Sequence, residues 1–124
     1  MKFLLALALL AGGGVYLWDR YDSDSLLNWA AKNVNSQHSE EVEYGVGICN
    51  YYADNREKAV KAFSQLIDLH GAGKYAADAL YYRASLYQAM GDRGRALADY
   101  SRLSESFPDA AKAALARTSL TMLR

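Results

Sequence analysis

Few residues of the chain could do chemistry, and they are scattered. The two histidines, His38 and His70, are isolated and lie outside the spacings that bind a metal, and His70 fits a helix cap better than a catalytic base. Cys49 is the only cysteine, and its apolar neighbours predict a buried side chain rather than a nucleophile. The acidic run at 40–43 is typical of a helix start, and the acids at 19–24 lack the glycine and distal glutamate of a calcium loop. We therefore expect no enzyme, no cofactor and no metal site.

The tyrosines are more informative, because the chain has 10 of them. Tyr44 and Tyr81 stand 37 residues apart in equivalent sequence contexts, and Tyr52 lies two helical turns beyond Tyr44. A tyrosine offers a large rigid face and a hydroxyl, which suits recognition surfaces. Two interpretations stay open. The tyrosines either pack between helices with only their hydroxyls exposed, or form a binding face for a protein or, by stacking on sugar rings, for a glycan.

The charge of the chain excludes bulk attraction to nucleic acid, because 14 basic residues balance 14 acidic ones. No patch interleaves basic and aromatic residues, so we expect no nucleic-acid partner. The charge is unevenly spread: residues 1–50 carry three basic and six acidic residues, and residues 93–124 carry six basic and three acidic. This asymmetry indicates either solvated helix faces or head-to-tail contact between copies, which would make a homo-oligomer.

The N-terminal segment is strongly apolar. Residues 3–18 are 16 uncharged residues that follow Lys2. One interpretation is a secretory signal, with its apolar region at 3–11 and a small-residue cleavage region at 12–14. The other is an uncleaved membrane anchor, because no typical Ala-x-Ala cleavage site is present and aromatic residues follow at once.

As an anchor, residues 3–18 would give about 24 Å of helix, short of the ~30 Å hydrocarbon core unless the aromatic residues near its end extend it at the interface. Lys2 would stay in the cytoplasm, and the acidic residues at 19–24 would follow on the far side. We therefore predict that residues 1–24 are a membrane anchor or signal segment. The rest then lies on the periplasmic side of the inner membrane, or in the periplasm if the segment is cleaved.

An internal repeat organises the rest of the chain. Residues 47–71 align with residues 84–108 at an offset of 37. The equivalent pairs are Gly47 and Ala84, Ala59 and Ala96, Phe63 and Tyr100, and Leu66 and Leu103. Apolar residues recur at helical spacing in each copy, which predicts helices rather than strands.

Each copy reads as two amphipathic helices. The predicted helices span residues 40–53, 56–70, 75–90, 93–107 and 109–123. Asp54 with Glu57 has the spacing of a capping box. Gly91 suits the left-handed residue that ends a helix, and Asp92 can cap the next one. Pro108 suits the first turn of the last helix.

In this pattern the chain resembles the tetratricopeptide repeat (TPR), which runs W-x2-L-G-x2-Y, then A-x3-F, then P. The second copy matches through Leu80, Tyr87, Ala96, Tyr100 and Pro108, and the first through Gly47, Ala59 and Phe63. The departures are Arg83 where Leu is expected, Ala84 where Gly is, Asn50 where Tyr is, and Gly71 where Pro is.

The resemblance implies an all-α fold. We expect a short TPR-like solenoid of about two repeats plus a capping helix over residues 40–124, after the N-terminal hydrophobic helix and a short helix and linker at 25–39. The lengthened spacing and the Ser-Phe-Pro-Asp sequence at 106–109 are similar to exported bacterial TPR proteins. Examples are the Tol–Pal-associated division coordinator and the outer-membrane assembly lipoproteins.

The resemblance also implies the functional positions. The family's groove positions fall on Glu41, Tyr44, Ile48, Tyr51, Tyr52, Asp78, Tyr81, Tyr82, Ser85 and Gln88. The repeat-packing positions fall on Gly47, Ala59, Phe63, Ala84, Tyr87, Ala96, Tyr100 and Pro108. We therefore expect a membrane-anchored or exported adaptor that binds other proteins or peptides, as an accessory subunit of a cell-envelope complex. The alternatives are a self-assembling structural protein and a glycan-binding module.

The small residues at the predicted helix crossings generate a first test. Ala96→Leu should lower the free energy of unfolding by roughly 1–3 kcal/mol, because the added carbons overpack the crossing. Thermal denaturation followed by circular dichroism measures this change. An unchanged melting temperature would contradict the proposed register of the repeat.

Overall fold

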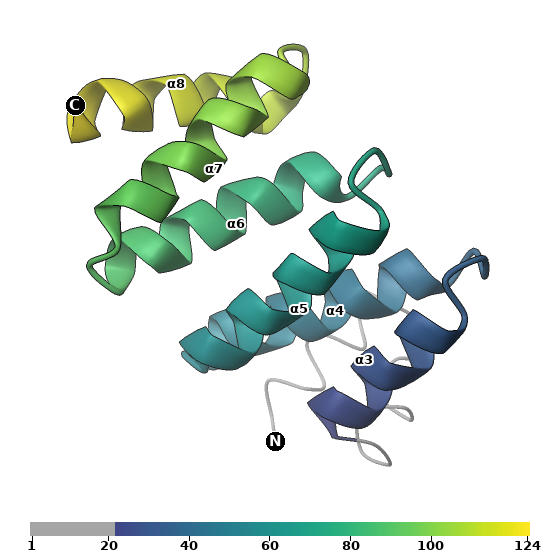
Figure 1. The fold of residues 1–124 in the computed structure, drawn as a ribbon. Coiled ribbons are helices and arrows are strands. Elements are labelled where there is room, and N and C mark those ends of the chain that lie inside the picture. Colours follow the sequence, from purple (N-terminus) through teal and green to yellow (C-terminus); the bar gives the residue numbers. More distant parts are fainter. Residues whose placement is uncertain (1–21) are drawn as a thin grey trace.

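The computed structural model describes residues 22–124, and all regular secondary structure within that range is helical. The helices are α3 (Ser23–Lys32), α4 (Ser39–Tyr52), α5 (Arg56–Leu69), α6 (Ala76–Ala89), α7 (Arg93–Ser106) and α8 (Ala111–Leu123). Consecutive helices pack side by side, and the chain runs from α3 at one end of the stack to α8 at the other (Figure 1). The predicted all-α helical-hairpin solenoid is therefore confirmed. The hydrophobic helix predicted at residues 3–18 lies outside the described residues.

The ends of α4 to α7 lie within one residue of the sequence prediction, whereas α3 begins at Ser23, two residues before the predicted short helix, and the last helix begins later than predicted. The prediction began that helix at 109 and placed Pro108 in its first turn. In the structure α8 begins at Ala111, and Ala110 is its N-cap residue with extended backbone angles. Pro108 and Asp109 form a turn between α7 and α8. Pro108 thus follows the end of α7 and does not lie in the first turn of α8, so the prediction for Pro108 is wrong.

The two turns inside the hairpins share one geometry. Gly91 has φ 81° and Asp54 has φ 61°, so both adopt the left-handed conformation that follows a helix. After α6 the amide of Asp92 donates to the carbonyl of Tyr87 at 2.8 Å, and the equivalent bond after α4 is 2.9 Å long. Asp92 also caps α7, because its Oδ1 accepts from the amide of Arg95 at 3.1 Å. Both predictions for the second turn are confirmed.

The capping box predicted for Asp54 and Glu57 is wrong. Asn55, not Asp54, is the N-cap residue of α5, and it makes no side-chain cap bond. Asp54 instead does the work of a glycine at the end of α4, and its carboxylate pairs with Arg56 at 3.2 Å. A left-handed aspartate is tolerated because its short polar side chain bonds locally. The repeat offset of 37 could have predicted this left-handed residue, because it aligns Asp54 with Gly91.

The core of each hairpin is a close crossing between a small residue and an aromatic ring. A Cβ added to Gly47 would lie 2.5 Å from the ring of Phe63, which is fully buried. Tyr100 is 2% exposed and Ala84 is 0% exposed at the equivalent positions of the second hairpin. Ala59 and Ala96 are also fully buried.

One set of equivalent positions differs sharply between the two hairpins. Arg83, which replaces the leucine of the repeat pattern, donates two bonds of 2.7 Å to Asp99 and one of 3.1 Å to Ser64. The positions 37 residues earlier are apolar and pack together, and they are Val46, Ala62 and Leu27. The same site is therefore ionic in the second hairpin and hydrophobic in the first.

The two ends of the stack are incomplete units. Because Leu27 is equivalent to Ser64 of α5, α3 takes the place of the second helix of a preceding hairpin. Helix α8 takes the place of the first helix of a following one. Its outer side is polar: exposed Arg117, Thr121 and Arg124 stand where α6 has Leu80, Ala84 and Tyr87. This polar side suits a terminal cap.

The left-handed turn after α6 generates a second test. Gly91→Ala should lower the free energy of unfolding by roughly 1–2 kcal/mol, because a side chain disfavours φ 81° although nothing lies within 4 Å of the new Cβ. The control is Gly45→Ala in the interior of α4, where the space is also open. There alanine should raise the free energy of unfolding by roughly 0.5–1 kcal/mol, because it has less conformational freedom to lose than glycine. Equal effects of the two changes in denaturant titrations would contradict this account of the turn.

Candidate functional site

The tyrosines predicted to bind a partner form one connected cluster on α4 and α6. The ring centroid of Tyr51 lies 5.2 Å from that of Tyr52 and 5.0 Å from that of Tyr82. Tyr82 in turn lies 5.8 Å from Tyr81 and 6.5 Å from Tyr44. We call this surface, made of these five residues, the tyrosine face. It joins the first helices of the two hairpins.

The inner part of the tyrosine face is fixed by packing. Tyr44 stacks on Tyr75 with ring centroids 4.5 Å apart and lies 6.3 Å from Phe63 in the core. Burial, and after it the carboxylate of Asp78, raises the pKa of Tyr44 well above its usual range. Burial likewise raises the pKa of Tyr82 to about 12. Both phenols therefore stay neutral at physiological pH and can donate hydrogen bonds.

The other predicted groove residues differ in their access to solvent. Tyr52 is 69% exposed, and Gln88 is also exposed. Asp78 and Ser85 are half-buried. Ile48 is 7% exposed and lies in the core, so it supports the tyrosine face from below. The predicted set is thus a rigid base with an open edge at Tyr52.

Two exposed apolar residues of α8 stand at groove positions of the repeat register, and sequence reasoning missed them. Leu115 is 48% exposed and Met122 is 81% exposed. Applying the offset of 37 a third time aligns Leu115 with Asp78 and Met122 with Ser85. Both therefore occupy the register positions of the groove, although α8 lacks the rest of the repeat pattern.

A contact across α6 and α8 supports this register. Lys112 Nζ lies 5.5 Å from the ring centroids of both Tyr81 and Tyr82. Lys112 is equivalent to Tyr75, which stacks on Tyr44 in the first hairpin. The same pair of positions thus makes contact twice along the stack, and the cation adds a favourable interaction with the ring faces.

A serine, a histidine and a glutamate meet at the start of α4, but not as a catalytic triad. His70 Nε2 lies 3.0 Å from Ser39 Oγ and 3.3 Å from Glu43 Oε1. A triad uses both ring nitrogens of its histidine, one toward each partner. Ser39 is also fully buried and donates its proton to the carbonyl of Ala30 at 2.8 Å. This geometry leaves no accessible nucleophile.

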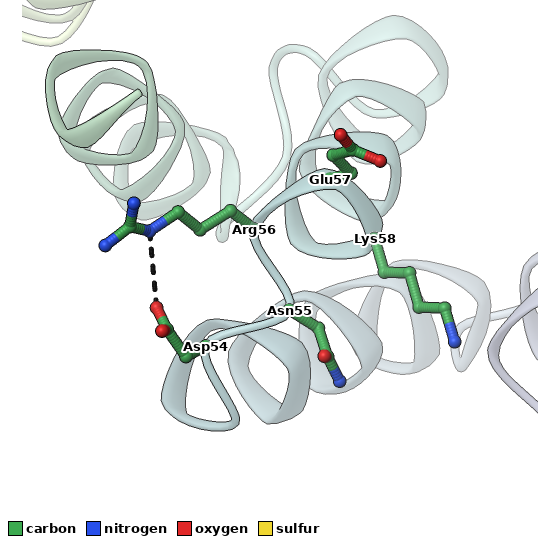
Figure 2. Close-up of a pocket in the computed structure, with 5 residues that line it drawn as sticks. All are labelled: Asp54, Asn55, Arg56, Glu57 and Lys58. Atoms are coloured by element: carbon green, nitrogen blue, oxygen red, sulfur yellow. Dashed lines mark ion pairs between the residues drawn. The ribbon is translucent and has the colours of Figure 1, made fainter. Parts of the chain in front are cut away.

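The turn between α4 and α5 carries a shallow depression (Figure 2). Its lining is five consecutive exposed residues, Asp54, Asn55, Arg56, Glu57 and Lys58. Figure 2 shows the Arg56 and Asp54 side chains paired across the turn, while Glu57 and Lys58 lie apart from them. A single turn without walls from a second element offers no enclosed site. Within residues 22–124, no three His, Cys, Asp or Glu side chains are grouped to hold a metal ion.

The family follows from the match of the helical hairpins to a family model. Residues 41–71 and 78–110 match the model of the tetratricopeptide repeat, and these ranges correspond to α4–α5 and α6–α7. The chain belongs to the tetratricopeptide repeat family. No curated protein matches the chain. TPR units generally mediate interactions between proteins, and the tyrosine face lies on the first helix of each TPR unit.

The different burial of two tyrosines generates a third test. Tyr44→Ala should lower the free energy of unfolding by roughly 2–3 kcal/mol, somewhat less than for a fully buried aromatic residue. Tyr52→Ala should change it by no more than about 0.5 kcal/mol, because that ring is 69% exposed. Urea titrations of both variants measure the difference. A large loss in Tyr52→Ala would mean that the edge of the tyrosine face belongs to the core.

Proposed function

We propose that this TPR protein is an adaptor whose tyrosine face binds a peptide segment of a partner protein. The observation that supports this is the connected cluster of tyrosines on α4 and α6, which is rigid at Tyr44 and open at Tyr52. Large rings already held in place lose little conformational entropy on binding. Leu115 and Met122 would contact the same peptide where it crosses α8.

The proposal includes attachment or export by the N-terminal segment. No helix within residues 22–124 is long and apolar enough to cross a membrane. The sequence of residues 3–18 fits either an anchor or a secretory signal. In both cases the TPR units would face the periplasm, because Lys2 precedes the apolar segment and acidic residues follow it.

An accessory role in a cell-envelope complex follows from this placement. The two TPR units give a small surface, which suits docking one protein to another within a larger assembly. The spacing of 37 and the Ser-Phe-Pro-Asp turn resemble exported bacterial TPR proteins of the Tol–Pal-associated or outer-membrane assembly type. That resemblance supports an envelope partner without naming it.

Binding rather than catalysis is the proposed mode of action. The grouping of Ser39, Glu43 and His70 has the wrong geometry for nucleophilic catalysis. Head-to-tail stacking of copies is less favoured, because the outer side of α8 carries exposed Arg117 and Arg124 where a stacking helix would need apolar residues. A glycan ligand remains an outcome that the experiment distinguishes.

Site-specific photocrosslinking in the native membrane tests the adaptor. A benzophenone amino acid at position 52 should give an adduct with a protein, while one at the exposed Ala98 on α7 should not, because α7 does not carry the tyrosine face. Tyr52→Ala should then weaken binding of that partner about tenfold or more, as for an aromatic hot spot, with helicity unchanged. Adducts from position 98 alone would refute the assignment. A protease-resistant adduct at position 52 would mean a glycan.

A further inference from the structure

A buried polar cluster lies where α3 meets the first TPR unit. Its central residue is Glu43 of α4, which is fully buried. Gln65 Nε2 of α5 donates to Glu43 Oε2 at 2.6 Å and to the backbone carbonyl of Leu27 in α3 at 2.7 Å. One amide group therefore joins three helices through the Glu43 carboxyl group.

The other members of the cluster make a second link to α3. Ser39 Oγ donates to the carbonyl of Ala30, near the end of α3, at 2.8 Å. His70, the C-cap residue of α5, lies within 3.0 Å of Ser39 Oγ and 3.3 Å of Glu43 Oε1. Despite that short distance, Glu43 Oε1 accepts no hydrogen bond. The cluster thus donates two hydrogen bonds to backbone carbonyls of α3, while the buried Oε1 of Glu43 accepts none.

The second TPR unit has nothing like it. The residues equivalent to Ser39, Glu43, Gln65 and His70 are Ala76, Leu80, Arg102 and Phe107. Ala76 and Leu80 are buried in the apolar core, and Arg102 is exposed. A leucine at position 43 would have completed a core like that of the second unit. The polar cluster is therefore a feature of the junction with α3 and not of the repeat.

We propose that Ser39, Glu43, Gln65 and His70 form a proton-binding latch, which holds α3 against the first TPR unit more firmly when it has bound a proton. The latch acts on the connection between the TPR units and the N-terminal segment, because α3 directly follows that segment in sequence. It does not depend on the tyrosine face.

The charges around Glu43 set the direction of the effect. The titratable groups that act on its carboxyl group are His70 of α5 and Glu40 on its own helix, and α3 offers it only the neutral atoms described above. Burial raises the pKa of Glu43, and the bond from Gln65 and the proximity of His70 oppose this only in part. The neutral carboxyl group costs less to bury than the carboxylate, whose Oε1 accepts no hydrogen bond although His70 Nε2 lies 3.3 Å away.

The sign follows from proton linkage. Release of α3 would open the cluster to water and should return the raised pKa of Glu43 toward its ordinary value, so the docked form holds more protons in the window above about pH 4.5. Docking is then firmest below that pH and weakens as the pH rises through the pKa of the docked form. One linked proton changes the opening equilibrium by at most about tenfold per pH unit.

Hydrogen exchange of the full chain, read by mass spectrometry, tests the latch. Protection factors are compared for α3 and α7 in the same sample, and each observed rate is divided by the intrinsic rate at that pH. Salt at about 0.5 M screens the exposed pair between Lys61 and Asp24, which also holds α3 at 2.8 Å. In the native chain the protection of α3 should fall by up to about tenfold per pH unit as the pH rises from about 4.5 to the pKa of the docked form and then level off, while that of α7 stays constant.

Two substitutions separate the latch from other titrations. Glu43→Gln keeps the shape but cannot titrate, so the protection of α3 should become independent of pH. Glu41→Gln removes a carboxyl group two residues away that is 46% exposed and pairs with Lys74, and it should keep the native profile. Glu43→Leu, which copies the second unit, should also remove the pH dependence.

Clear outcomes would overturn the proposal. A flat profile of α3 in the native chain would do so, whatever the variants show. The same fall in Glu43→Gln as in the native chain would assign the proton to another group. If Glu43→Gln lost protection in α7 as well, that variant would be unfolded. The test would then rest on the native profile and on Glu43→Leu, and a pH dependence of α3 that persisted in Glu43→Leu would overturn the proposal.

Discussion

The close crossing of two helices within each TPR unit fixes the geometry on which the rest depends. In the first unit the ring of Phe63 fills the space where a side chain on Gly47 would stand, since an added Cβ would lie 2.5 Å from it. In the second unit Ala84 and Tyr100 take these places, both nearly or fully buried. Small residues let the backbones of the paired helices approach, and the aromatic ring fills the space beside them. On these closely packed hairpins the first helices of both units bring their tyrosines into contact, which forms one face.

Much of this arrangement could be predicted from local rules and the offset of 37. Apolar spacing predicted the helices, and glycine and aspartate chemistry predicted the turn at Gly91 and Asp92. These features are local, because a turn depends on a few adjacent residues. The grouping of Tyr44 and Tyr81 on one face was also accessible, since residues at equivalent repeat positions line up in any regular stack.

The rest depended on contacts between distant residues. Asp54 has the spacing of a capping residue. In the structure it instead adopts the left-handed conformation that lets the chain turn after α4, so it cannot cap α5. The run at 40–43 reads as an acidic helix start, yet Glu43 points into the junction with α3 and is fully buried. Nothing in the sequence near Glu43 reveals Gln65 or the carbonyl of Leu27 as its neighbours. Leu115 and Met122 of α8 were missed because the repeat pattern fades there.

The ion pair of the second unit, between Arg83 and Asp99, affects which helices can pair during folding. Two similar units in one chain invite misfolded states in which α4 pairs with α7 instead of α5. Such a pairing would set Asp99 against Val46, and Arg83 would lose the partner that it holds at 2.7 Å. Breaking a buried ion pair in this way costs on the order of 3–5 kcal/mol. The ion pair between Arg83 and Asp99 thus forms only when α6 pairs with α7, and its loss disfavours the incorrect pairing.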